Sequence, residues 1–347
     1  MEKIYDIIIW GASGFTGRLA VEYIYRNQNN SNLTWAVAGR NESKIKEILD
    51  GKKNEKSLSE VLKWSWSREA PKKEFIETSE IINSEFFEDR KFYALWIGHS
   101  TFLVNNGDIT ILFDPIFSDR ASPLSFAGPK RLIKPAIDIK DLPKIDVITI
   151  SHNHYDHLDI NSLRKIQKRF PNVKILVPKG DLKLLKNYQL INGYEFIWWE
   201  DKIISNTKFT FTPAQHWSAR GLRDRNKSLW GSWFIKNDNK NIFHAGDTGY
   251  SKDFVEIKNK LGSVDFAMIP IGAYDPEWFM SYSHVTPEEA LNISIDLEAK
   301  KSIGMHWGTF ILTDEPVLEP RERLKKIVSE TNINFYTVEP GIMIELY

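Results

Sequence analysis

Residues 146–157 read Asp-Val-Ile-Thr-Ile-Ser-His-Asn-His-Tyr-Asp-His, an apolar, β-branched run followed directly by ligand-type side chains. The first part predicts a buried strand. Because residues two apart on extended backbone point the same way, His152 and His154 can share one metal ion. Asp156 and His157 follow, where the chain must curl toward a second cation. The stretch therefore predicts metal ligands held on the rigid end of a strand.

One loop with four ligands cannot complete two metal sites, so further ligands are expected after other strands. Each of three downstream residues sits just beyond an apolar or β-branched run and next to glycine, tryptophan or both. We predict that one zinc ion is bound by His152, His154 and His216, that the other is bound by Asp156, His157 and His306, and that Asp247 bridges them. Two cations about 3.5–4 Å apart hold a hydroxide between them and offset the charge that develops on an attacked phosphorus or carbonyl carbon.

Short β-rich segments bounded by Gly, Pro, Asp and Asn recur around this stretch. They lie at 93–97, 109–113, 146–150, 174–177, 209–212, 230–235, 241–245, 265–269 and 342–346. Helical patterns at 160–169, 287–299 and 320–330 alternate with some of them. The predicted class is α/β.

Composition limits the kinds of partner. Lysine plus arginine equals aspartate plus glutamate at 46 each among 347 residues, so no global field favours nucleic acid or anionic lipid, and nucleic-acid binding is not expected. Cysteine is absent, which leaves histidine and carboxylate as the strong metal ligands. These ligands accept several divalent ions, iron and manganese included. No window approaches the roughly 18 apolar residues of a membrane span, so we expect a soluble, cytoplasmic protein.

Several polar residues near the predicted ligands have alternative roles. His99 and Asp114 fit groups that orient ligands, as metal sites commonly require, although a purely structural role is equally compatible. His244 faces away from Asp247 if strand alternation holds, so we expect a structural role. Lys130 and Arg131 can meet a phosphate, but adjacent basic residues are more often solvated.

The ligand pattern resembles the metallo-β-lactamase superfamily of hydrolases, which carries His-x-His-x-Asp-His followed by a distant His, Asp and His. Within it, the sequence resembles the N-acyl-phosphatidylethanolamine-hydrolysing phospholipase D family and its bacterial relatives. The stretches that carry this resemblance lie at 96–101, 114–118, 121–123, 128–131, 151–159, 212–217, 229–233, 245–250, 269–274, 284–290 and 306–310. The resemblance runs from about residue 60 to the C-terminus.

The resemblance implies a four-layer αββα sandwich with two zinc ions at one edge. It also implies that Tyr155 and His284 contact the phosphodiester of a phospholipid substrate, that the protein touches membranes peripherally, and that it forms a homodimer. From the residues alone, a buried and hydrogen-bonded tyrosine is an equal alternative for Tyr155. His284 precedes Thr286 and Pro287, a helix start, so it can equally belong to a structural cap.

The first 50 residues pose a separate question. A strand at 5–10, glycines at 11–17, an amphipathic stretch at 18–25 and a strand at 34–38 resemble the opening of saccharopine-dehydrogenase-like reductases. A complete dinucleotide site needs about 100 residues or more. We therefore predict an incomplete Rossmann-like βαβ fragment at 1–50 without a cofactor site, a charged connector with a short helix at 51–90, and a hydrolase domain at 91–347.

The predicted reaction is metal-dependent hydrolysis of a glycerophospholipid phosphodiester. Asp156 and Asp247 hold the metals and pass the proton, and His284 stabilises the added negative charge. One alternative is a hydrolase of the same superfamily that acts on a lactone or a soluble phosphodiester, because the metal chemistry does not choose between phosphorus and carbon. A second alternative is an NADP-binding module with a degenerate hydrolase body, which would bind no zinc.

Overall fold

The computed structural model describes residues 7–10, 35–38, 68, 70–79, 84–87, 90–221, 223–238 and 240–346. The chain divides into two compact units, residues 1–67 and 68–347.

In the first unit, strand β1 (Ile7–Trp10) pairs with β2 (Trp35–Ala38) in parallel. A parallel pair needs a crossover connection, which agrees with a βαβ unit. The predicted glycine turn at 11–17, the helix at 18–25 and the connector helix lie outside the described residues. The predicted boundaries of the N-terminal fragment and connector stay predictions.

The second unit contains two seven-stranded sheets. The first sheet has the order β16 (Met343–Glu345), β3 (Tyr93–Gly98), β4 (Thr101–Asn105), β5 (Thr110–Phe113), β6 (Val147–Thr149), β7 (Lys174–Pro178) and β8 (Gly193–Phe196). The second sheet has the order β15 (Phe335–Tyr336), β14 (Ser302–Met305), β13 (Phe266–Pro270), β12 (Asn241–His244), β11 (Ser232–Lys236), β10 (Thr207–Thr212) and β9 (Asp201–Ile204).

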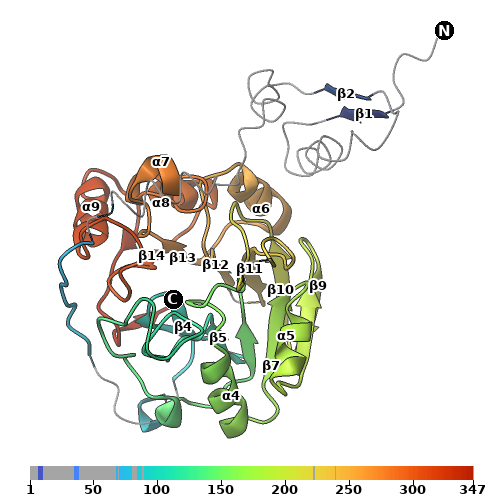
Figure 1. The fold of residues 1–347 in the computed structure, drawn as a ribbon, viewed down its shortest axis with the longest axis vertical. Helices are drawn as coiled ribbons and strands as arrows, with labels where there is room; N and C mark the ends of the chain where they lie inside the picture. Colours follow the sequence, from blue (N-terminus) through green and yellow to red (C-terminus); the bar gives the residue numbers. More distant parts are fainter. Residues whose placement is uncertain are drawn as a thin grey trace. The chain divides into compact units, whose positions relative to one another are not determined.

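Helices cover the outer faces of both sheets (Figure 1). The first sheet is covered by α4 (Ile160–Arg169) and α5 (Leu182–Asn187), and the second by α6 (Asp253–Leu261), α8 (Pro287–Asp296) and α9 (Glu319–Val328). Short turns of helix lie at α7 (Glu277–Met280), η2 (Ser84–Phe87) and η3 (Ile139–Asp141). The predicted α/β class and four-layer αββα sandwich are therefore confirmed.

Strand β3 shows why the layers form. All of its residues are buried, and successive side chains point to opposite faces. Ala94 and Trp96 enter the core between the sheets, whereas Leu95 and Ile97 pack in the core that includes Leu163 of α4. A strand buried on both faces has a continuous apolar sequence rather than an alternating one.

Parallel strands bring distant residues to one edge. In the first sheet β5, β6 and β7 run parallel, and in the second sheet β12, β13 and β14 do. The carboxyl ends of parallel neighbours lie at the same edge of a sheet, where α/β proteins usually place their sites. Among the described residues, no helix is both long and apolar enough to cross a bilayer.

Candidate metal centre

The predicted ligands follow strand ends in both sheets. The loop 152–157, called the ligand loop below, follows β6, whereas His216 follows β10, Asp247 follows β12 and His306 follows β14 directly. The structure brings all of these side chains together in one cluster, in which His154 and Asp156 are half-buried and the others are buried. The strand-end spacing in the sequence therefore leads to a single site.

Three histidines form the first group. The Nδ1 atom of His154 lies 2.8 Å from Nε2 of His152 and 3.2 Å from Nε2 of His216. The Oδ2 atom of Asp247 lies 3.9 Å from the same nitrogen of His152 and 3.8 Å from that of His216. Three imidazole nitrogens thus lie within ligand distance of one another, and a carboxylate oxygen lies beside two of them.

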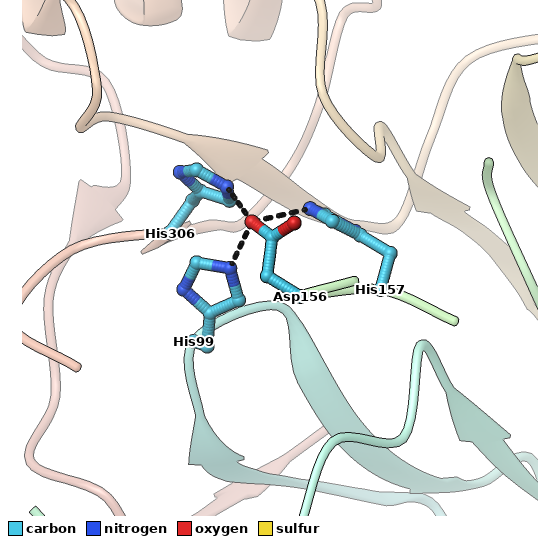
Figure 2. Close-up of side chains that lie close together, drawn as sticks. All are labelled: His99, Asp156, His157 and His306. Atoms are coloured by element: carbon cyan, nitrogen blue, oxygen red, sulfur yellow. Dashed lines mark hydrogen bonds and ion pairs between the residues drawn. The ribbon is translucent and has the colours of Figure 1, made fainter. Parts of the chain in front are cut away.

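The second group contains Asp156, His157 and His306, and Figure 2 shows these three side chains pointing toward one another. The Oδ2 atom of Asp156 lies 3.5 Å from Nε2 of His157 and 3.4 Å from Nε2 of His306. Asp247 lies 3.2 Å from the His157 nitrogen through Oδ2 and 3.1 Å from the His306 nitrogen through Oδ1. Four ligands about 2.0–2.1 Å from a zinc ion stand about 3.3–3.4 Å from one another at tetrahedral angles. The four distances above are close to that spacing, and Oδ2 of Asp247 also faces the first group.

Hydrogen bonds fix which nitrogen of the His152, His157 and His216 rings faces the cluster. The Nδ1 atom of His157 donates to Oδ2 of Asp114 at 2.7 Å, and that of His216 donates to the Ser283 carbonyl at 2.9 Å. The Ser151 hydroxyl donates to Asp114 at 2.5 Å and can therefore accept from Nδ1 of His152 at 3.0 Å. In the neutral form of these three rings, Nε2 is the atom with a lone pair, which is the form that binds a metal.

The charges in the cluster also fit a cation. Burial would lower the pKa of His157, but nearby carboxylates, Asp247 first among them, outweigh it and hold that pKa well above its usual value. In the same way the pKa of His306 is raised to about 9. Without a metal, these two rings must carry protons to balance two buried carboxylates. A divalent cation supplies the same charge, and imidazole with carboxylate is a ligand set that zinc accepts.

His99 and Asp114 lie where ligand-orienting groups were expected. The Nε2 atom of His99 donates to Oδ2 of Asp156 at 2.9 Å (Figure 2). His99 and Asp114 adopt left-handed backbone conformations, with φ of 55° and 38° respectively, and so does His306, with φ of 61°. Such conformations in residues other than glycine persist only where surrounding contacts hold them, and they gather at functional sites.

The two predicted substrate contacts, His284 and Tyr155, lie at different places relative to the cluster. Nδ1 of His284 lies 3.9 Å from Oδ2 of Asp247, and the capping box at Thr286 is present. The hydroxyl of Tyr155 donates to the backbone carbonyl of Arg220 at 2.9 Å. Both His284 and Tyr155 are partly buried.

The side chains of His244 and Arg131 hydrogen-bond to backbone carbonyls. Nε2 of His244 donates to the Ser100 carbonyl at 2.9 Å, a contact that fits the structural role expected for this histidine. Arg131 is buried and donates to Ser118 at 3.2 Å and Ile116 at 2.6 Å. Lys130 is exposed.

The sequence analysis did not identify three residues that contact the cluster or the ligand loop. Ser151 precedes His152 in the decisive stretch, so its position in the motif is a signal that could have identified it. Ser283 acts through its carbonyl, which has no side-chain signature. Arg220 contacts the ligand loop from a different segment, and no local pattern marks it.

We predict that Asp114→Asn weakens metal binding by about 10–100-fold, because the His157 ring loses the carboxylate that orients it. Competition against a chelator measures this. Asp146→Asn is the matched control: Asp146 accepts the Thr110 amide at 3.0 Å, just before β6, at the opposite end of that strand. Equal metal affinity in the two variants would contradict the orienting role.

Comparison with known proteins agrees with this geometry. A family model described as a beta-lactamase superfamily domain matches residues 110–307. The chain is 39% identical over 276 residues to N-acyl-phosphatidylethanolamine-hydrolyzing phospholipase D 1 of Caenorhabditis elegans, covering 75% of this chain and 78% of that protein. It is 43% identical over 247 residues to the mitochondrial N-acyl-phosphatidylethanolamine-hydrolyzing phospholipase D of Saccharomyces cerevisiae, covering 68% of this chain and 51% of that protein.

A solved structure shares the fold. Igni18, a metallo hydrolase from the archaeon Ignicoccus hospitalis, superposes with a TM-score of 0.54 at 21% sequence identity, over 73% of this chain and 97% of that one. At this identity the likeness concerns the fold alone.

Proposed function

The chain belongs to the beta-lactamase superfamily and is a hydrolase of the metallo-β-lactamase fold, and on that premise we propose that it uses two zinc ions to hydrolyse glycerophospholipid phosphodiesters. The substrate class we propose is N-acyl-phosphatidylethanolamine and related lipids. The observation that carries the proposal is the position of Asp247, whose two oxygens each lie 3.1–3.2 Å from a ring nitrogen of the second group while Oδ2 also faces the first.

We assign the side chains as the sequence predicts them. One zinc would be held by His152, His154 and His216, which lie within ligand distance of one another, and the other by Asp156, His157 and His306. Asp247 would be shared, because its Oδ2 atom faces nitrogens of both groups. Bound there, the zinc ions would lower the pKa of a water and offset negative charge on the attacked phosphorus.

In this proposal, side chains of the chain bind the substrate and move the proton of the attacking water. The His284 ring, 3.9 Å from Asp247, is the group we propose to donate to the phosphodiester, and Tyr155 lies in the ligand loop as a second substrate contact. Asp156 and Asp247 hold their ligand positions and accept the proton of the attacking water. The head-group oxygen then leaves with a proton.

Metal analysis and turnover test this proposal together. We expect two zinc ions per chain, and release of phosphatidic acid from a phospholipid before chelation but not after it. Faster turnover of a lactone or of a soluble phosphodiester would replace the proposed substrate while leaving the metal centre intact. A protein that binds NADP and no metal would overturn the hydrolytic assignment for this chain.

We also propose where the protein meets the lipid. Leu124 and Phe126 are large apolar residues with 47% and 78% exposure in the loop after β5. A hollow of about 780 Å³ beside them is lined by one acid, Asp119, and by four basic residues, Arg120, Arg164, Lys165 and Lys168. Exposed apolar side chains beside clustered cations fit the surface of an anionic bilayer.

The proposed membrane surface is continuous with the ligand loop. A second hollow of about 640 Å³ shares Ser122, Pro123 and Asn161 with the first and reaches Tyr155. A lipid head group at the surface is thus near the loop that carries the proposed metal ligands.

The homodimer that the family resemblance implies is a separate proposal, which light scattering in solution tests.

Reversing charge on this surface should weaken vesicle binding. Each basic residue near an anionic bilayer contributes about 1 kcal/mol, so Arg164→Glu with Lys165→Glu should lower affinity by about 30-fold or more. Lys325→Glu with Lys326→Glu is the matched control, because these are also adjacent, exposed cations on a surface helix, α9. Co-sedimentation with phosphatidylserine vesicles measures the effect. Equal losses in both double variants would contradict a defined surface.

A further inference from the structure

The ligand loop is not part of a helix or strand, so something else must hold it. Within the loop, the amides of His157 and Leu158 donate to the carbonyl of His154 at 3.1 and 2.9 Å. These two bonds form a turn but do not fix it to the rest of the molecule. Metal affinity depends on how well such a loop is positioned before the ion binds.

One side chain spans the loop from outside. The Nη1 atom of Arg220 donates to the carbonyl of Asn153 and to the carbonyl of Leu158, each at 2.8 Å. Asn153 stands at the start of the turn and Leu158 directly after its last ligand. A single guanidinium nitrogen, with two N–H groups, therefore joins both ends of the turn.

Arg220 is itself held by the loop and by its neighbours. Its guanidinium carbon lies 3.9 Å from the centre of the Tyr155 ring, and the Tyr155 hydroxyl donates back to the Arg220 carbonyl at 2.9 Å. The Asp224 carboxylate accepts the Arg220 amide at 3.2 Å and the Gly221 amide at 2.8 Å. Stacking and hydrogen bonding together keep the plane of the guanidinium in one orientation.

The position of Arg220 in the chain gives this contact its consequence. It comes four residues after His216, in the loop that follows β10 of the second sheet, whereas the ligand loop follows β6 of the first. The contact therefore ties together ligand-bearing loops from two different sheets. Its loss would let His216 and the ligand loop drift apart.

We propose that Arg220 is a positioning residue for the metal centre, which sets metal affinity by fixing the ligand loop relative to His216. It acts through the backbone of the loop and is not one of the proposed metal ligands. An arginine suits this role because two donors and a flat, stackable face are on one group, whereas a lysine offers only a point charge. The inference rests on the metal part of the proposed function and is independent of the substrate.

The test compares Arg220→Gln and Arg220→Lys with Arg223→Gln as the matched control. Arg223 is exposed in the same loop and, in the described part of the chain, has no hydrogen bond to the ligand loop. Competition against a chelator should show metal binding about 10–100-fold weaker in Arg220→Gln, a smaller loss in Arg220→Lys, and none in the control. Saturating metal should restore most of kcat, with little change in KM.

Hydrogen exchange of the metal-free protein gives a second measurement. The amides of His157 and Leu158 should exchange faster in the Arg220→Gln variant, while amides of the β3 core keep their protection. Wild-type metal affinity and unchanged exchange would overturn the proposal, as would a lower Tm without either change. If Arg220→Gln does not fold, Arg220→Lys decides by the same two readouts. A wild-type protein without metal affinity would refute the proposed function, and exchange in the loop would still test Arg220.

Discussion

The variant Asp247→Asn should lose activity by about 1,000-fold or more in kcat/KM, which corresponds to about 4 kcal/mol of transition-state stabilisation. One Asp247 oxygen lies 3.1 Å from the His306 nitrogen, and the other lies 3.2 Å from the His157 nitrogen. An asparagine keeps the shape but removes the negative charge that would balance the two proposed cations. The proposed activation of a water needs both cations.

Metal content separates this effect from a simple loss of folding. Elemental analysis should find fewer than two zinc ions per chain in Asp247→Asn, with an unchanged circular dichroism spectrum. Asp138→Asn is the control, because that side chain is 71% exposed and lies outside the cluster. A variant that keeps two metals and activity within tenfold of wild type would refute the bridging role of Asp247.

The clustering of the proposed ligands was predictable because the signal is local. A buried strand followed by alternating histidines can be recognised without knowing the fold, and each downstream ligand also follows its own strand. Helix α4 was predicted at 160–169 and is observed there, with an N-cap at Asp159 whose side chain accepts the Asn161 amide. Sequence signals succeed where a residue's neighbours in the chain are also its structural context.

Strand β9, which the sequence did not predict, depends on tertiary contacts. Strand β9 carries Asp201 and Lys202 and has mostly exposed or half-buried residues, so its composition resembles a loop. It is at the edge of the second sheet, where pairing with β10 provides the order that local propensity does not. Arg220 was missed for the same reason, since its role appears only when two sheets bring their loops together.

Removal of the metals should change how stability depends on pH. In the metal-free protein the pKa of His306 is raised to about 9 and that of His157 lies well above its usual value, because burial is outweighed by carboxylates. Their unfolded value is about 6.5. A group with a raised folded pKa contributes stability that is complete below the unfolded pKa and is lost as the pH rises through the folded one.

The other buried rings do not cancel this trend. Burial holds the pKa of His152 and His216 well below the usual value, so their contribution rises with pH and is complete near pH 6.5, about their unfolded pKa. The pKa values of Asp156 and Asp247 are lowered despite burial, because nearby histidines stabilise the charged carboxylates. The contribution of these carboxylates to the stability of the protein is therefore lost only in acid. Of these six groups, His157 and His306 are the ones whose folded-state protonation changes above about pH 6.5.

The metal-free protein should therefore melt at progressively lower temperature from about pH 6.5 to pH 9.5, with His306 alone contributing up to about 3 kcal/mol. The metal-loaded protein should not follow, because metal binding displaces those protons and tightens as the pH rises. Thermal melts of both forms measure a gap in Tm that widens with pH. His306→Gln is the internal control, since the metal-free variant lacks one of the two titrating rings and should show a shallower slope. A metal-free Tm that stays level or rises over this range would mean that the carboxylates do not hold His157 and His306 protonated, and the charge argument for a cation at this site would fail.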